Sequence, residues 1–160
     1  MKTKLYFPLF VDLSDKKIVV AGGGTIAERR VKTLLPFSES MTVIAPSCTK
    51  ELQRLEEKGL ILLRKRSVEA ADFAGADMVL AATDDNMVND EIYRLCKDAG
   101  ILVNVCSDRK KCDFYFPGVV QKENIVVGVT ASGANHRMAK QVREAIACAV
   151  DKMTGENENG

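Results

Sequence analysis

The chain lacks a long apolar run and lacks an excess of charge of either sign. Crossing a bilayer takes about 20 consecutive apolar residues, and no stretch of the 160 residues approaches this length. The 23 basic and 22 acidic residues leave a formal net charge of +1, which provides no field to attract nucleic acid or an anionic membrane. The first residues do not resemble a signal peptide. We therefore expect a cytoplasmic protein that has neither a membrane nor a nucleic acid as its partner.

The sequence also lacks any C-x-x-C pair. Its five cysteines are scattered and odd in number: Cys48, Cys96, Cys106, Cys112 and Cys148. This pattern indicates a reducing compartment, in which most of these thiols are small buried apolar groups. The length suits one domain with an appendage, and the hydrophobic fraction of 46% is ordinary for a globular protein.

Strand-like and helix-like segments alternate through the first two thirds of the chain. We expect helices at 25–35, 49–58 and 87–99, and strands at 17–21, 41–45, 60–63, 77–82 and 101–105. Such alternation predicts an α/β fold of Rossmann type, with a parallel sheet, right-handed crossovers and helices on both faces.

The pattern changes after Cys106. An extended stretch at 114–120, a strand at 124–130 and an amphipathic helix at 137–153 follow. The sequence therefore predicts a nucleotide-binding domain over residues 1–105, a strand and helix extension over 106–153, and a polar, disordered tail over 154–160.

The first expected strand runs directly into a glycine turn. Gly22, Gly24 and Ala27 fit the G-x-G-x-x-G/A pattern that binds dinucleotides. Gly22 allows the tight turn, Gly24 lets the backbone approach a pyrophosphate, and Ala27 allows close packing of helix on strand. The helix N-terminus then offers free N–H groups to phosphates. The alternative is a turn that serves only strand and helix packing.

Ligands of open α/β sheets bind beyond the carboxyl ends of the strands. Four segments would converge there: 22–27, 45–47, 82–84 and 104–108. An acid that binds the ribose hydroxyls is expected about 20 residues after the glycines, but Ala45, Pro46 and Ser47 provide none. Ser47 or backbone groups must replace it, and Lys50 is the nearest cation, so charge does not decide between NAD and NADP.

Five ordered motifs resemble the precorrin-2 dehydrogenase family, which comprises the N-terminal module of sirohaem synthase and its stand-alone relatives. The resemblance extends from about Tyr6 to Val150, and no methyltransferase module follows, as in the short, single-activity form. The motifs are 6–13, 22–30, 81–85, 104–105 followed by 112–117, and 132–133 before the last helix.

The resemblance implies NAD-dependent oxidation of precorrin-2 to sirohydrochlorin, in which a hydride passes to the nicotinamide and a proton passes to a base or to water. It also implies a homodimer joined through the C-terminal extension. Some relatives insert Fe²⁺ as well, so a bifunctional dehydrogenase and ferrochelatase is one alternative. A non-catalytic dinucleotide-binding sensor or scaffold is another.

The resemblance and the expected convergence of strand ends together give the candidate site residues. No resident metal is expected, because the spacing of the cysteines with Asp108 and His136 fits no standard zinc pattern. The candidate dinucleotide contacts are Gly22, Gly23, Gly24, Thr25, Ile26, Ala27, Pro46, Ser47, Ala82, Thr83, Asp84, Asn104 and Val105.

Two residues are candidates for proton transfer. The family's proposed catalytic aspartate falls at Ser107 in this chain, and the acid follows one residue later as Asp108. Asp108 is therefore the candidate base, with the capping of a turn as the alternative role. His136 is the only histidine, and an imidazole suits proton transfer, but a histidine that simply begins the last helix is the other interpretation.

Overall fold

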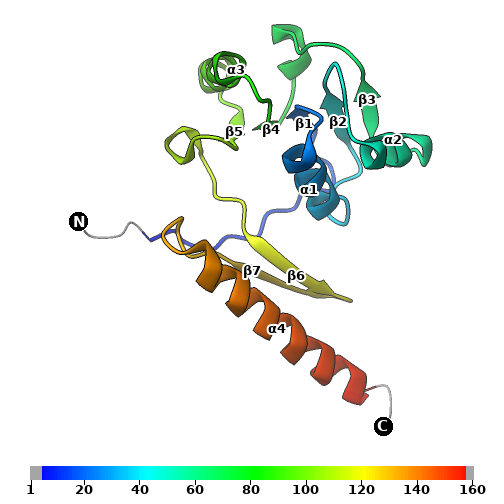
Figure 1. Ribbon diagram of the computed structural model, residues 1–160, viewed down its shortest axis with the longest axis vertical. Helices are drawn as coiled ribbons and strands as arrows, with labels where there is room; N and C mark the ends of the chain where they lie inside the picture. The colour runs from blue at the N-terminus through cyan, green and yellow to red at the C-terminus, as the bar shows by residue number, and fades with distance from the viewer. Residues whose placement is uncertain (1–4, 158–160) are drawn as a thin grey trace. The chain divides into compact units, whose positions relative to one another are not determined.

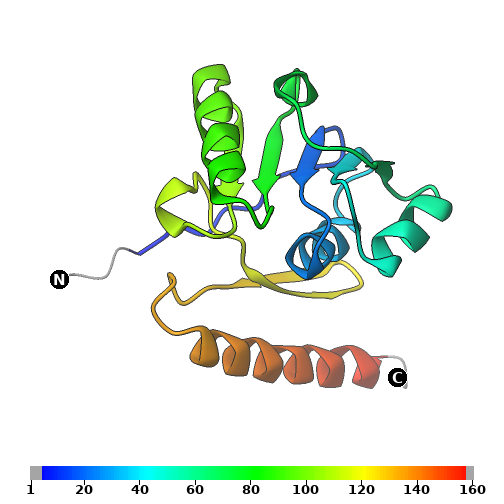
Figure 2. The ribbon, with the colours of Figure 1, turned by 45° about the horizontal axis from the view of Figure 1, so that its top comes forward.

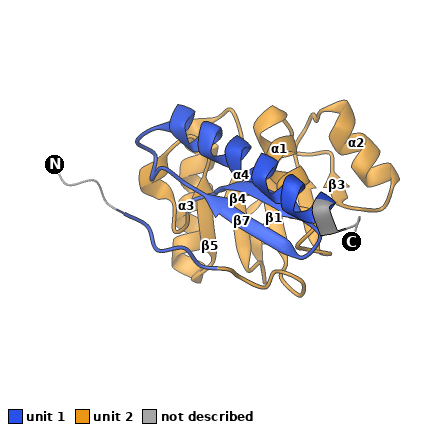
Figure 3. Cartoon of the chain, turned by 90° about the horizontal axis from the view of Figure 1, so that it is seen from below, with its two compact units in different colours: residues 1–9, 115–160 blue, residues 10–114 orange. Residues whose placement is uncertain are grey.

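The computed structural model describes residues 5–157, which divide into two compact units. One unit comprises residues 10–114, and the other comprises the N-terminal segment to Leu9 together with residues from Tyr115 onward (Figure 3). No helix among the described residues is long and apolar enough to cross a membrane.

The larger unit is built on a sheet of five parallel strands in the order β3-β2-β1-β4-β5 (Figure 1). This confirms the Rossmann-like α/β fold. The strands are β1 (Ile18–Ala21), β2 (Met41–Ile44), β3 (Leu62–Arg64), β4 (Met78–Ala81) and β5 (Leu102–Val105).

The two central strands are buried along their whole length, because helices cover both faces of the sheet. Every residue of β1 and β4 is buried, which explains why these strands are continuous apolar runs without polar alternation. On one face lie α1 (Thr25–Leu34) and α2 (Lys50–Glu57). On the other, α3 (Asn86–Ala99) packs against β4, β5 and the short 3-10 helix η1 (Ala70–Phe73) (Figure 2).

The larger unit extends beyond residue 105, where the sequence predicts the domain boundary. After β5 the chain makes a 3-10 turn, η2 (Arg109–Lys111), and returns along the strand. The backbone N–H of Asp113 donates to the Val103 carbonyl at 2.9 Å, and the Asp113 carboxylate accepts from the Val103 N–H at 3.0 Å. These bonds close the outer edge of β5 and keep residues up to Phe114 within the unit.

The smaller unit contains an antiparallel hairpin and the last helix. The hairpin pairs β6 (Gly118–Lys122) with β7 (Ile125–Val129), and α4 (His136–Asn157) follows. Within this unit the ring centroids of Tyr6 and Tyr115 lie 4.1 Å apart, so the N-terminal segment contacts the start of the C-terminal part. Helix α4 continues to Asn157, beyond the expected end at residue 153, and residues 158–160 of the expected tail lie outside the described part.

Candidate functional site

The carboxyl ends of four strands meet at one edge of the sheet, as the sequence predicts. Ala21 pairs with Ile44 and with Ala81, and Ala81 pairs with Val105. Backbone bonds continue beyond the strands: the Ala82 N–H donates to the Ala21 carbonyl at 2.8 Å. The loops that follow these strands therefore start side by side.

The first two glycines of the turn are required by the fold itself. Gly22 has a φ of +120°, and a β-carbon there would overlap the carbonyl of Ala82. A β-carbon at Gly23 would overlap the carbonyl of Ser47 and lie 2.9 Å from the side chain of Ala45. The turn after β1 is thus packed tightly against the loops that follow β4 and β2.

Gly24 is different, because a β-carbon at this position would meet no protein atom within 4 Å. Gly24 is the N-cap of α1, has an ordinary φ of −81°, and provides no side-chain cap for the first turn. Gly24, Thr25 and Ile26 are exposed, whereas Ala27 is fully buried. The N–H groups at the start of α1, which have no side-chain cap, can donate to a phosphate group, so the turn fits the pyrophosphate of a dinucleotide.

The loop after β2 borders this turn and carries no acid. Pro46 and Ser47 are exposed. Thr49 ties the loop down, because its N–H donates to the Gly23 carbonyl at 3.0 Å and its hydroxyl accepts from the Leu52 N–H at 3.3 Å. Positions 45–47 hold no carboxylate.

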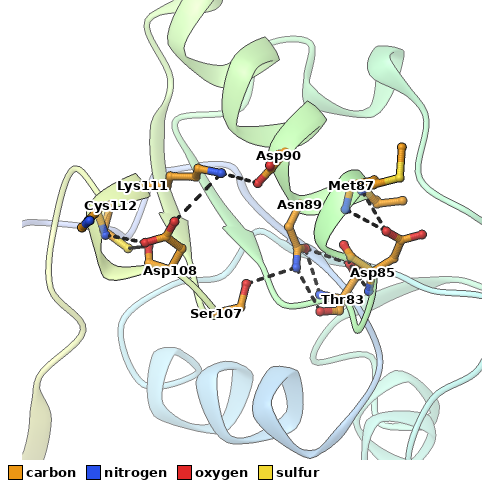
Figure 4. A network of polar contacts seen from close by, with 11 residues as sticks. Thr83, Asp85, Met87, Asn89, Asp90, Ser107, Asp108, Lys111 and Cys112 are labelled. Carbon is orange, nitrogen blue, oxygen red and sulfur yellow. Dashed lines mark hydrogen bonds and ion pairs between the residues drawn. The ribbon is translucent and has the colours of Figure 1, made fainter.

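The loop after β4 is held by a residue that the sequence analysis does not single out. Asn89 of α3 is 1% exposed, and its side-chain amide bonds to the backbone and to the hydroxyl of Thr83 (Figure 4). Asp85 caps α3 by accepting from the N–H groups of Met87 and Val88. Asp84 is exposed beside them. One signal for Asn89 is present in the sequence, since asparagine is a poor residue for a helix interior.

The predicted contacts on β5 lie inside the fold. Val105 is 2% exposed and Asn104 is 5% exposed. The side-chain amide of Asn104 donates to the Phe114 carbonyl at 2.9 Å and its oxygen accepts from the Cys106 thiol at 3.7 Å. In this structure Asn104 therefore fastens the returning segment to β5.

Ser107 and Asp108 point in different directions (Figure 4). Ser107 is exposed and its hydroxyl accepts from the Asn89 amide at 3.5 Å. The Asp108 carboxylate accepts from the Lys110 N–H at 2.9 Å and lies 3.9 Å from the ammonium of Lys111, so it caps η2. Among the expected proton-transfer residues, His136 begins α4 in the smaller unit and is exposed.

Two thiols lie behind this loop. Burial raises the pKa of Cys106, an effect that the nearby Arg30 guanidinium partly offsets, and burial also raises the pKa of Cys112. Both thiols donate to oxygens of the chain, Cys106 to Asn104 and Cys112 to the carbonyls of Val105 and Asp108. Within residues 5–157 no three histidine, cysteine or acidic side chains are arranged to hold a metal ion.

The Rossmann sheet and the tight glycine turn at its carboxyl edge define a dinucleotide-binding protein. A family model described as "Putative NAD(P)-binding" matches residues 9–118. The precorrin-2 dehydrogenase of Bacillus subtilis is 35% identical over 90% of this chain and 88% of its own length. The chain belongs to the precorrin-2 dehydrogenase family.

Two further comparisons agree. A solved structure of SirC, precorrin-2 dehydrogenase, has a TM-score of 0.81 at 26% identity and covers 90% of this chain and 70% of that one. The "Probable multifunctional siroheme biosynthesis protein HemA" of Ruminiclostridium josui is 43% identical over 88% of this chain. The chain spans 27% of that relative's length, so it matches one part of a larger protein.

Proposed function

We propose that this protein oxidises precorrin-2 to sirohydrochlorin with NAD as the electron acceptor. The observation that carries the proposal is the glycine turn at the carboxyl edge of the sheet, in a chain that matches a precorrin-2 dehydrogenase over nearly its whole length. Gly24 supports it most, because nothing in the described fold occupies the position of its missing side chain.

The chain's own groups supply binding and proton transfer. The N–H groups at the start of α1 would hold the pyrophosphate, and Ser47 would face the ribose. When bound, the nicotinamide supplies the hydride acceptor. The substrate loses one hydride and one proton in total, and Asp108 is the proposed acceptor of the proton, with His136 as a second candidate.

Two further features bear on the oligomeric state and on the cellular compartment. Helix α4 keeps large apolar side chains exposed, including Met138 at 52% and Met153 at 68%. A second copy that packs on this extension would cover them, so we propose a homodimer. All five cysteines are free thiols, in keeping with the reducing conditions of the cytoplasm.

The experiment is an anaerobic assay of the purified chain with precorrin-2 and NAD, which follows sirohydrochlorin by its absorbance. We expect turnover by the wild type and a loss of turnover in Asp108→Ala at unchanged NAD affinity. Asp108→Asn is the matched variant, because an amide can still cap η2 but cannot take a proton. An unchanged rate in both variants would remove Asp108 from the mechanism.

The same preparation separates the alternatives. Tight NAD binding without turnover would indicate a sensor or scaffold in place of an enzyme. Addition of Fe²⁺ to sirohydrochlorin tests ferrochelatase activity, which would appear as sirohaem formation above the rate without protein.

A further inference from the structure

We propose that Asn89 is the positioning residue of this site. One buried amide would hold the loop after β4 and the loop after β5 in a single arrangement, so that dinucleotide binding and Ser107 depend on the same side chain. The part of this proposal that concerns turnover rests on the proposed function, whereas the part that concerns NAD binding does not.

The acceptor side of the amide holds Thr83. Asn89 lies in the first turns of α3 and is 1% exposed. Its Oδ1 accepts from the backbone N–H of Thr83 at 3.2 Å and from the Thr83 hydroxyl at 2.8 Å. A buried oxygen with two donors directed at it fixes the backbone of that residue as well as its side chain.

The amide nitrogen of Asn89 makes a third bond to Thr83 and one bond to the loop after β5. The Asn89 Nδ2 donates to the Thr83 carbonyl at 3.0 Å and to the Ser107 hydroxyl at 3.5 Å. With two donors and two acceptor positions in use, the hydrogen-bonding capacity of the amide is filled. Removal of the amide would leave partly buried backbone groups of Thr83 without these partners, and such groups are costly to leave unpaired.

The polar groups of Thr83 are bonded within the chain, so Thr83 helps to fix the geometry of the loop. Its N–H, carbonyl and hydroxyl all bond to Asn89, and the hydroxyl is also within hydrogen-bond distance of the Asp85 backbone at 3.0 Å. The Thr83 backbone nitrogen lies 3.0 Å from the position that a β-carbon on Gly22 would take. Thr83 therefore lies beside the glycine turn.

In the loop after β5, Ser107 and not Asp108 is the residue that faces the Asn89 amide. Ser107 is directed toward Asn89, while the neighbouring Asp108 is directed toward Lys111 (Figure 4). Because the Ser107 oxygen accepts from Asn89, the hydroxyl keeps its own proton to donate. The returning segment is held independently, by Lys111 on Asp90 at 2.5 Å and Lys97 on Asp113 at 2.7 Å. The role of Asn89 is accordingly local to Thr83 and Ser107.

The test compares Asn89→Ala and Asn89→Asp with a control of similar burial. Asp72→Asn is the control, because Asp72 is also buried but bonds to Arg64 and Arg66 in place of Thr83 and Ser107. For each variant, urea unfolding gives stability, calorimetric titration gives the NAD dissociation constant, and precorrin-2 kinetics give kcat and KM. NAD binding and kinetics are measured under conditions in which urea unfolding shows that every variant is fully folded.

We expect Asn89→Ala to weaken NAD binding about tenfold or more, since it removes several bonds to one loop. Asn89→Asp keeps both acceptor bonds to Thr83, so NAD binding should fall less, while kcat falls as in Asn89→Ala. Asp72→Asn should lower stability with unchanged NAD binding and kinetics. NAD binding by Asn89→Ala within about twofold of the wild type would overturn the proposal, as would parallel losses in the Asp72→Asn control.

A double-mutant cycle with Ser107→Ala tests the link between the loops. If Asn89 acts on turnover through Ser107, the effect of Ser107→Ala on kcat should largely disappear in the Asn89→Ala background. Fully additive effects would overturn that link. NAD binding that depends on Asn89 in a wild type without turnover would refute the proposed function and leave the positioning role standing. A wild type that binds no NAD would refute both.

Discussion

Gly22 and Ala82 are in such close contact that no other residue fits at position 22. The φ of +120° at Gly22 strains any residue with a side chain, and the β-carbon would overlap the Ala82 carbonyl. The turn after β1 and the loop after β4 are therefore one packed unit. Two positions along, Gly24 meets no protein atom within 4 Å of an added β-carbon.

Alanine substitutions at these two glycines should have opposite effects. We expect Gly22→Ala to lower the free energy of unfolding by about 2 kcal/mol or more, because it adds strain and overlap. Gly24→Ala should stay within about 0.5 kcal/mol of the wild type but weaken NAD binding at least about tenfold, because its methyl group would enter the pyrophosphate position. Urea unfolding and calorimetric titration measure both quantities. Wild-type NAD affinity in Gly24→Ala would contradict the assignment of the turn.

Asp72 should make the stability of the larger unit depend on acid pH. Hydrogen bonds from Arg66, with further bonds from the Glu69 N–H and Arg64, lower the pKa of Asp72 from its ordinary 3.8 to about 2. A pKa that is lowered in the folded state stabilises the fold above the unfolded value and loses that contribution as the pH falls from about 4 to about 2. Because both arginines are partly exposed, we expect a contribution of about 1–2 kcal/mol.

The check is urea unfolding across this pH window with Asp72→Asn as the matched variant. The wild type should lose its advantage over the variant as the pH falls. A difference between the two proteins that stays constant from pH 4 to pH 2 would rule out this origin.

The missing ribose acid predicts weak discrimination between the two dinucleotides. Without a carboxylate at positions 45–47, nothing at this loop repels a 2′-phosphate. Ser47→Asp should place an acid near the ribose and reduce kcat/KM with NADP at least about tenfold relative to NAD. Ser47→Ala is the control and should leave the ratio unchanged. An unaltered ratio in Ser47→Asp would show that the ribose lies elsewhere.

Cys48 should report binding at the same loop. Its Cα lies 2.9 Å from the position of a β-carbon on Gly23, and the side chain is half-buried. We expect saturating NAD to slow alkylation of Cys48, measured by mass spectrometry of the labelled peptides. Cys96 is the internal control, since burial raises its pKa to about 11 and its side chain is 0% exposed. It should react only after unfolding, with or without NAD.

The sheet and the glycine turn could be predicted because their signals are local. Continuous apolar runs mark β1 and β4. A glycine at position 22 by itself indicates a turn with a positive φ. The 3-10 helix η1 could not be foreseen in this way, because it is four residues long and is fixed by Asp72, whose partners lie on the neighbouring strand and loop.

The loops of the site depend on contacts between distant residues, which sequence patterns do not reveal. Asp113 bonds to Val103, and the Asn89 amide bonds to Ser107, which lies 18 residues further along the chain. The proximity of Thr83 to Gly22 likewise follows only from the pairing of β1 with β4. The strands and the glycine turn of this edge could therefore be predicted, whereas the bonds of Asn89 to Thr83 and Ser107 could not.

The most direct measurement of the central claim is the stoichiometry of the oxidation. Purified wild-type protein is incubated anaerobically with precorrin-2 and limiting NAD, and sirohydrochlorin and NADH are quantified together. The account predicts that the two products form in equal amounts, only when both substrates are present, and that Gly24→Ala forms them more slowly at the same NAD concentration. Sirohydrochlorin that forms at the same rate without NAD, or no product from a folded protein that binds NAD, would contradict it.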